Sequence, residues 1–188
     1  MNLKTTFHIR KNIIPDDFCN KIIQDAEKLT IKEGELSNNG VDSVGKSRSC
    51  KLSWIKDEHL KKTFSYFVQS ANRESDWYFS LKHFENLQYT IYYKNDHYGW
   101  HIDSRSKPYD NGMIRKLSFT LCLNDDFEGG EFDICYPDPR EKKDVIRSFK
   151  LKKGDMIVFP SHTWHRVNPV TKGTRKSLVG WALGPQWI

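Results

Sequence analysis

Two stretches in the first half of the chain carry apolar residues at helical spacing. The first stretch follows Pro15 and two acidic residues, and its apolar positions are Phe18, Ile22, Ile23, Ala26 and Leu29. The second stretch starts at Asp57, and its apolar positions are Leu60, Phe64, Phe67, Val68 and Ala71. Each pattern predicts a helix that buries one face against a core, with acidic residues at the favourable N-terminal end. Neither stripe suggests a cofactor site.

From residue 87 onward the pattern changes to the alternating, β-branched and aromatic positions that are typical of strands. In this part of the chain strands are predicted at 87–93, 116–123, 131–136, 145–151, 156–159, 163–167 and 175–183. Before residue 87, a strand is predicted at 7–14 and a short extended segment at 52–55. Two helices followed by about eight short strands, without βαβ alternation, predict a mainly β fold. We expect an antiparallel sandwich or barrel with the N-terminal helices packed on one side.

Polar, Gly-rich or Pro-rich stretches separate these elements and predict turns and loops. They are residues 34–45, 94–98, 104–112, 124–130, 137–144 and 168–173. The loop at 104–112 directly follows His101 and Asp103, which are candidate metal ligands, so it is well placed to cover a substrate.

Composition places the chain among globular proteins and suits one domain over residues 1–188. The net charge of +6 and the pI near 9.0 permit an acidic partner without requiring one, and the scattered lysine pairs predict a solvated basic surface. Four cysteines form no C-x-x-C pair. With neither a signal-like N-terminus nor an apolar run of membrane-spanning length, the chain is expected in a reducing cytoplasm, off the membrane.

An imidazole and a carboxylate lie two residues apart at His101 and Asp103. On an extended strand these side chains point to the same face and could hold one metal ion. A third ligand could come from residues 159–167, which offer both His162 and His165. Two histidines and one carboxylate form the facial triad of non-haem Fe(II) oxygenases, although a His-x-Asp pair by itself is common by chance.

Arg175 and Ser177 follow the second histidine pair across the turn at 168–173. If the flanking segments form a hairpin centred near Val170, Arg175 lies opposite His165. An arginine in that position would bind a carboxylate through two parallel donors, so a dicarboxylic co-substrate could join the metal at one end and Arg175 and Ser177 at the other.

The motifs together resemble those of the Fe(II)/2-oxoglutarate-dependent dioxygenases, specifically the prolyl 4-hydroxylase type, over residues 12–183. The matching segments are Gln88-x-x-x-Tyr92, Tyr98-x-x-His101-x-Asp103, Leu123-Asn124 before Gly129-Gly130-Glu131, Gly154-Asp155, Phe159-Pro160, and His165-x-Val167 with Arg175. Arg48-Ser49-Cys50 ahead of Trp54 is similar to an Arg-x-Ser segment of those enzymes, with cysteine in place of serine.

The resemblance implies a double-stranded β-helix (jelly roll) in which His101, Asp103 and His165 hold Fe(II). It favours His165 over His162, because the family has a valine two residues after the ligand. Arg175 would hold the 5-carboxylate of 2-oxoglutarate, with Ser177 and Tyr92 beside it. A second pocket tyrosine of some members is replaced by Cys122, which leaves the completion of the carboxylate site open.

The implied activity is hydroxylation of an unactivated C–H bond, with O2 and 2-oxoglutarate consumed, succinate and CO2 released, and L-ascorbate as reductant. The expected substrate is a prolyl residue of a peptide or protein, contacted by residues around the ligands: Arg48, Tyr98, Trp100 and Trp164. Another side chain or a free amino acid is the alternative within the class. A nucleic-acid substrate is not expected, because no second arginine clusters with Arg175 in the sequence.

Two interpretations outside the class remain. A zinc hydrolase could use the same three ligands with one water, and an inactive jelly roll could serve as a binding module. The sequence fixes neither the physiological substrate and hydroxylated position nor the oligomeric state.

Overall fold

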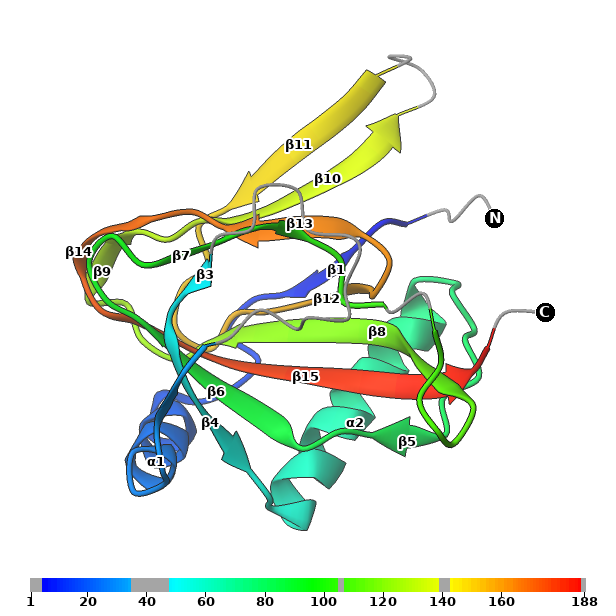
Figure 1. Cartoon of the computed structure of the whole chain (residues 1–188), viewed down its shortest axis with the longest axis horizontal. Helices are drawn as coiled ribbons and strands as arrows, with labels where there is room; N and C mark the ends of the chain where they lie inside the picture. Colours follow the sequence, from blue (N-terminus) through cyan, green and yellow to red (C-terminus); the bar gives the residue numbers. More distant parts are fainter. Residues whose placement is uncertain (1–4, 35–47, 105–106, 139–142, 187–188) are drawn as a thin grey trace.

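Two antiparallel β-sheets face each other in the computed structural model, which describes residues 5–34, 48–104, 107–138 and 143–186 (Figure 1). The larger sheet has the order β1-β12-β8-β15-β6-β4-β2, and β5 is added to β15. Its strands are β1 (His8–Arg10), β2 (Lys32–Glu33), β4 (Lys51–Ile55), β5 (His83–Phe84), β6 (Leu87–Tyr92), β8 (Met113–Cys122), β12 (Met156–Pro160) and β15 (Arg175–Pro185). The long strands β8 and β15 lie side by side in the interior of this sheet.

The smaller sheet has the order β11-β10-β13-β7-β3. Its strands are β3 (Arg48–Ser49), β7 (His97–His101), β10 (Phe132–Asp138), β11 (Lys143–Phe149) and β13 (Trp164–Val167). A separate ladder joins β9 (Phe127–Gly129) to β14 (Val170–Gly173). The pair β10–β11 projects beyond the rest of the barrel, with β11 at the sheet edge (Figure 1).

Two helices, α1 (Asp16–Ala26) and α2 (Glu58–Glu74), lie against the outer face of the larger sheet, away from the smaller one (Figure 1). Asp57 caps α2, because its carboxylate accepts a hydrogen bond from the backbone N–H of Leu60 at 2.9 Å. Both helices occur where the apolar stripes predicted them. None of the helices in the described ranges is long and apolar enough to cross a membrane.

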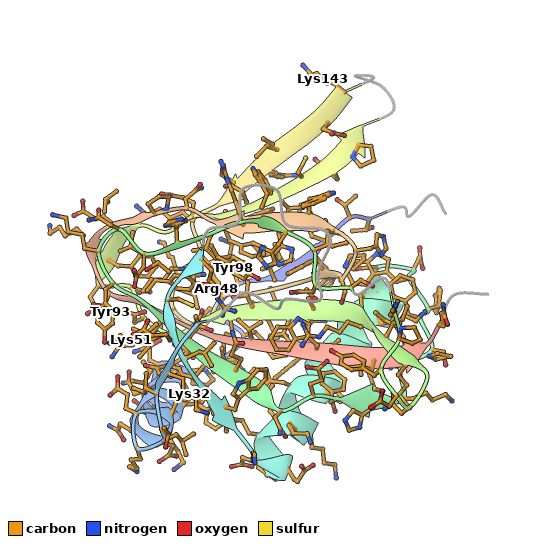
Figure 2. The ribbon with its side chains drawn as sticks, viewed as in Figure 1. Lys32, Arg48, Lys51, Tyr93, Tyr98 and Lys143 are labelled. Atoms are coloured by element: carbon orange, nitrogen blue, oxygen red, sulfur yellow. The ribbon has the colours of Figure 1, made fainter. Side chains whose placement is uncertain are left out.

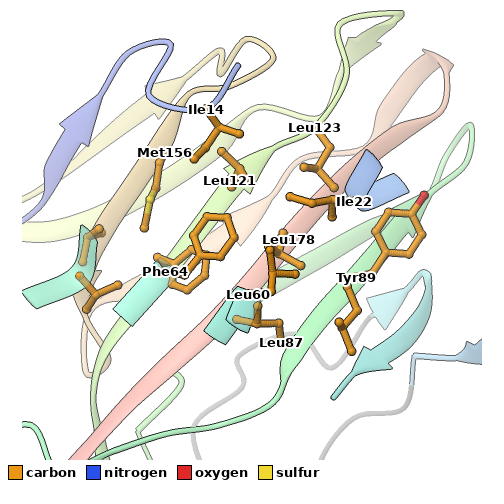
Figure 3. Close-up of a cluster of buried hydrophobic side chains, with 14 of the residues drawn as sticks. Ile14, Ile22, Leu60, Phe64, Leu87, Tyr89, Leu121, Leu123, Met156 and Leu178 are labelled. Atoms are coloured by element: carbon orange, nitrogen blue, oxygen red, sulfur yellow. The ribbon is translucent and has the colours of Figure 1, made fainter. Parts of the chain in front are cut away.

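The main core lies between these helices and the larger sheet (Figure 3). The Phe64 ring of α2 stacks on Phe119 of β8 with centroids 5.2 Å apart. Gly180 of β15 lies next to Phe119, and a Cβ added to Gly180 would come within 2.5 Å of the Phe119 ring. The helices therefore cover one face of the sheet and leave the other face to the space between the two sheets. The predicted mainly β jelly roll with helices on one side is confirmed.

Several predicted boundaries were wrong. The first strand covers only His8–Arg10 and not 7–14, and β7 begins at His97, inside the predicted turn at 94–98. Residues 137–138 and 143–144 of the predicted loop at 137–144 belong to the ends of β10 and β11, because β-pairing extends further than the apolar pattern does. Residues 139–142 lie outside the described residues. Residues 35–45 of the predicted loop at 34–45 lie outside the described residues.

The predicted hairpin between residues 163 and 183 does not form. The presumed turn contains β14, which pairs with β9, so β13 and β15 separate into different sheets. Arg175 pairs with Tyr92 of β6, whereas His165 pairs with His101 of β7. The two residues therefore face each other across the barrel instead of lying side by side in one ladder.

Candidate metal centre

His101 and His165 are direct neighbours on the paired strands β7 and β13 of the smaller sheet. Their rings lie 4.1 Å apart between centroids, and both side chains are buried. The Nδ1 atom of His101 is 2.8 Å from the carbonyl oxygen of Gly99, and that of His165 is 2.9 Å from the carbonyl oxygen of Thr163. Because a carbonyl only accepts, each Nδ1 carries the proton and each Nε2 keeps its lone pair for a metal.

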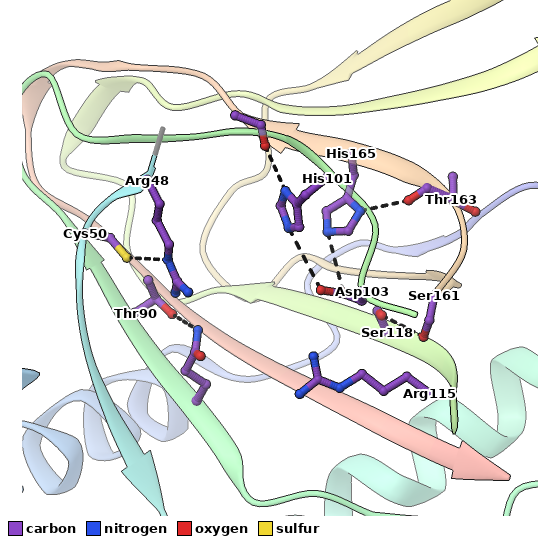
Figure 4. Close-up of polar contacts among 12 residues, drawn as sticks. Arg48, Cys50, Thr90, His101, Asp103, Arg115, Ser118, Ser161, Thr163 and His165 are labelled. Atoms are coloured by element: carbon purple, nitrogen blue, oxygen red, sulfur yellow. Dashed lines mark hydrogen bonds and ion pairs between the residues drawn. The ribbon is translucent and has the colours of Figure 1, made fainter. Parts of the chain in front are cut away.

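Asp103 lies just beyond the end of β7, not on the strand as the i, i+2 argument supposed. Its backbone N–H donates to the carbonyl oxygen of Ser161 at 2.9 Å, which bends the chain back toward the histidines. The carboxylate oxygens lie 3.9 Å from Nε2 of His101 and 3.5 Å from Nε2 of His165 (Figure 4). The three potential ligand atoms all lie within 4.8 Å of one another.

The surroundings hold these groups in the charge states that a metal requires. Burial, together with the neighbouring His165, lowers the pKa of His101 to about 3, so its imidazole is neutral at neutral pH. Burial raises the pKa of Asp103, but His165, His101 and Arg115 outweigh that effect and bring it to about 2. A neutral imidazole beside an ionised carboxylate is a suitable donor set for a divalent cation.

The donor set fits Fe(II). Two imidazole nitrogens and one carboxylate converge from one side, and a cavity opens on the other side. This composition and one-sided arrangement match the 2-His-1-carboxylate triad of non-haem Fe(II) oxygenases, which leaves coordination positions open.

The cavity between the two sheets has a volume of about 620 Å³. Its walls include all three potential ligands as well as Arg175, Ser177 and Tyr92 from the larger sheet. Both sheets thus contribute to the site. The smaller sheet supplies the two histidines, and the larger sheet supplies Arg175.

Arg175 is a buried cation, 2% exposed, at the start of β15. Its Nη1 donates to the hydroxyl of Ser177 at 3.1 Å, and its guanidinium lies 5.5 Å from the Tyr92 ring centroid. No carboxylate in the described part of the chain forms an ion pair with it. A buried charge without a counter-ion is costly, so this end of the cavity is suited to an anionic ligand.

The other predicted contact residues divide into two groups. Tyr98 lines the cavity and stacks on His101 with ring centroids 3.6 Å apart, while Arg48 lies 4.6 Å above the Tyr98 ring (Figure 2). Trp100 and Trp164 do not line the cavity. They flank His101 and His165 along their strands, and alternation turns them to the opposite face.

The structure adds cavity residues that the sequence interpretation missed. Trp181 lies four residues beyond Ser177 on the same face of β15, and its buried indole N–H has no hydrogen-bond partner among the described residues. Trp54, 41% exposed, lies 6.0 Å from Trp181 between ring centroids and also lines the cavity. The period of two that links Arg175 to Ser177 was the available signal for Trp181.

Two further arginines, Arg48 and Arg115, line the same cavity as Arg175. Arg115 lines the cavity, lies 3.8 Å from the Trp181 ring centroid, and pairs with both oxygens of Glu85 at 2.8 and 2.6 Å. Arg48 lines the same cavity. Because these residues are far apart in sequence, only the folded chain shows that they line one cavity.

Comparison with known proteins identifies the family. Residues 87–183, just over half of the chain, match the model of the 2OG-Fe(II) oxygenase superfamily. The chain belongs to this superfamily. The relationship inferred from the motifs is therefore confirmed, and this segment contains the three potential ligands and Arg175.

Relatives and solved structures agree with this assignment. A PKHD-type hydroxylase of Idiomarina loihiensis is 44% identical over 92 residues, which cover 48% of this chain and only 38% of that protein. The match thus spans well under half of the relative's length. The viral collagen prolyl hydroxylase of Paramecium Bursaria Chlorella virus-1 superposes with a TM-score of 0.70 at 19% identity, covering 96% of this chain and 97% of the other.

A prolyl hydroxylase from Trichoplax adhaerens, solved with a peptide fragment of the hypoxia inducible factor oxygen degradation domain, superposes with a TM-score of 0.71. The identity is 20%, over 95% of this chain and 84% of the other. At these identities the superpositions establish that the chain has the prolyl hydroxylase fold.

Proposed function

We propose that this protein is an Fe(II)- and 2-oxoglutarate-dependent hydroxylase that acts on a prolyl residue of a peptide or protein. The observation that carries the proposal is the cluster of buried His101 and His165 with partly buried Asp103, which faces Arg175 across one cavity. Arg175 has no ion-pair partner among the described residues. One end offers a metal site, and the other offers an anion site. A 2-oxo dicarboxylic acid matches both ends.

Each residue has a role in this scheme. Nε2 of His101, Nε2 of His165 and the Asp103 carboxylate hold the metal. Arg175 donates to the distal carboxylate of 2-oxoglutarate, with the Ser177 hydroxyl and Tyr92 beside it. When bound, Fe(II) and 2-oxoglutarate supply the O2 activation that inserts oxygen into a C–H bond, releasing succinate and CO2.

The remainder of the cavity would hold the substrate. Tyr98 lies on one side of the metal ligands, while Arg115, Trp181 and the partly exposed Trp54 line the wall formed by the larger sheet. The unpartnered indole N–H of Trp181 requires an acceptor, which a peptide carbonyl provides. The apolar rings are suited to a pyrrolidine ring and exclude water from the reacting atoms. The two prolyl hydroxylase folds named above also favour a peptide substrate.

Succinate formation from 2-oxoglutarate by the purified protein with Fe(II), L-ascorbate and O2 tests the class. Iron-dependent succinate that His101→Ala and Arg175→Ala both abolish would support it. Succinate formation that survives either substitution, or tight zinc binding without succinate under any condition, would overturn it.

A screen of proline-containing peptides tests the substrate. The expected product gains the mass of one oxygen on proline. If an enzyme that forms succinate instead oxidises a different side chain, a free amino acid or an oligonucleotide, the class is right and the prolyl assignment is wrong.

A further inference from the structure

The strand β7 contains one extra residue between Tyr98 and His101. Its neighbour β13 pairs His165 with His101 and Val167 with Tyr98, so a step of three residues on β7 matches a step of two on β13. On a regular strand, residues three apart point to opposite faces. A β-bulge of this kind re-aims side chains. It brings Tyr98 and His101 to the same face, where both line the cavity.

The Tyr98 ring stacks on the imidazole of His101. The ring centroids lie 3.6 Å apart, and the ring planes differ by 12°. Nδ1 of the imidazole donates to the carbonyl oxygen of Gly99 at 2.8 Å, and Nε2 faces the Asp103 carboxylate at 3.9 Å. Rotation of the imidazole about its Cβ–Cγ bond would drive its edge into the Tyr98 ring. The stack therefore holds the orientation in which Nε2 points at the other ligand groups.

Arg48 supports the Tyr98 ring from its other face. The two residues are paired across β3 and β7, and the guanidinium carbon lies 4.6 Å from the ring centroid (Figure 2). An imidazole 3.6 Å away leaves no room for a guanidinium on the same face of the ring. Nε of Arg48 donates to Sγ of Cys50 at 3.0 Å. Gly34 packs so closely on these two groups that an added Cβ would collide with both, so the guanidinium is held in place.

We propose that Tyr98 is a positioning residue that holds the His101 imidazole in its metal-binding orientation, with Arg48 as its support. The inference rests on the proposed function, because it assumes that His101 is a metal ligand. A ring that is already oriented loses less conformational freedom when the metal binds, so the stack raises the metal affinity of the centre. Tyr98 acts through His101 and does not need to contact the metal.

The test is the Mn(II) affinity of the full chain, measured from the free-ion signal in electron paramagnetic resonance. Tyr98→Leu removes the flat ring and should weaken Mn(II) binding by about 3–10-fold, the size expected when one side chain regains its freedom. Tyr98→Phe keeps the stacked ring, so it should bind Mn(II) as the wild type does.

Trp100→Leu is the matched control. Trp100 directly precedes His101 on β7 but does not line the cavity. The Arg166 guanidinium lies 4.6 Å from its ring centroid, the same distance as in the pair of Arg48 and Tyr98. Trp100→Leu should lower thermal stability without changing Mn(II) affinity. An equal loss of affinity in this variant would assign the effect to the strand as a whole and contradict the role of Tyr98.

Arg48→Lys tests the support at constant charge. Removing the charge would also relieve its repulsion of the bound cation and obscure the result. Lysine lacks the planar group that stacks on the ring, so Mn(II) affinity should fall, by less than in Tyr98→Leu. Unchanged affinity would overturn the part assigned to Arg48.

Nuclear magnetic resonance of the metal-free protein observes the orientation of the ring directly. The Nδ1–H that His101 donates to Gly99 should give a ¹H–¹⁵N signal that His101→Ala removes. Tyr98→Leu should weaken this signal, because the freed ring exchanges its proton with water faster. The Nδ1–H of His165, which is held by the carbonyl oxygen of Thr163, should keep its signal. Equal weakening of both signals would indicate a general loosening of the site and overturn the proposal.

The outcomes separate the positioning role from the function beneath it. If the wild type binds no Mn(II), or if His165→Ala leaves binding intact, the proposed metal centre fails and the positioning role with it. If the wild type binds and Tyr98→Leu binds equally well, only the positioning role is wrong. Should Tyr98→Leu fail to fold, Tyr98→Met takes its place, because it fills a similar volume without a flat ring. Unchanged affinity in that variant then contradicts the role.

Discussion

The two faces of the larger sheet are equally buried but hold different kinds of residue. On β15, Leu178 packs into the core on the helix side and is 0% exposed. On the opposite side Arg175 and Ser177 are 2% and 1% exposed. The same strand thus contributes close-packed apolar contacts to the fold and polar groups to the cavity. Burial therefore does not distinguish the two faces, whereas the polarity of their side chains does.

The comparison has an energetic consequence. The helix side stabilises the folded chain by removing apolar area from water. The cavity side lowers stability until a ligand arrives, because Arg175 has no counter-ion in the described residues and Trp181 has an unused donor. Sites that violate the rules of stable packing are expected where a protein binds something.

The largest expected effect lies on the cavity side. Arg175→Ala should weaken binding of 2-oxoglutarate to the Mn(II)-loaded protein by about 3–6 kcal/mol, or more than about 100-fold, because two hydrogen bonds to a charged group are lost. Isothermal titration calorimetry measures this loss. Lys176→Ala is the control, since Lys176 is the next residue of β15 and pairs with Glu27 at 2.8 Å. Equal losses of 2-oxoglutarate affinity in both variants would show that the cavity face of β15 has no special part in binding it.

On the helix side, Phe64→Ala should lower the free energy of unfolding by about 3–5 kcal/mol, because it leaves a cavity against Phe119. Urea unfolding of the metal-free protein measures it. The 2-oxoglutarate affinity of the remaining folded protein should be unchanged. Phe67→Ala, at a partly buried position of the same helix, should cost less. A loss of 2-oxoglutarate affinity in Phe64→Ala would show that the two faces are coupled.

Metal should stabilise the protein through the cavity side alone. At an Mn(II) concentration about 100 times its Kd, the gain in unfolding free energy is about 2.7 kcal/mol, seen as a rise in Tm. The gain should vanish in His165→Ala. It should persist in Ser53→Ala, because Ser53 is a buried serine of β4 whose hydroxyl donates to the carbonyl oxygen of Ala26, away from the metal centre. A rise of the same size in His165→Ala would place the bound ion elsewhere.

The smallest effect is expected for Ser177→Ala. Its hydroxyl accepts from Arg175 at 3.1 Å, so the change should cost about 0.5–1.5 kcal/mol in 2-oxoglutarate affinity. Val179, the next cavity residue of β15, carries no polar group, so Val179→Ala should leave the 2-oxoglutarate affinity unchanged. A loss in Val179→Ala as large as that in Ser177→Ala would assign both effects to packing.

Local pattern was sufficient for part of this organisation. The stripe from Leu60 to Ala71 predicted α2, and the spacing of His101 and Asp103 predicted their meeting, because both relationships lie within one element or its end. The pairing of β14 with β9 was missed, because nothing near Val170 signals a partner about forty residues away. The meeting of Arg115 with Trp181, and the separation of Arg175 from His165 onto different sheets, likewise depend on long-range strand order.

The projecting β11 strand has a different consequence, for solubility. An edge strand presents unpaired backbone N–H and C=O groups on which another chain can add a strand. Among its exposed side chains, Lys143, Asp144 and Arg147 are charged, and only Ile146 is both large and apolar. Charges along an open edge make stacking of one molecule on the next unfavourable, so the hairpin can project from the barrel without promoting aggregation.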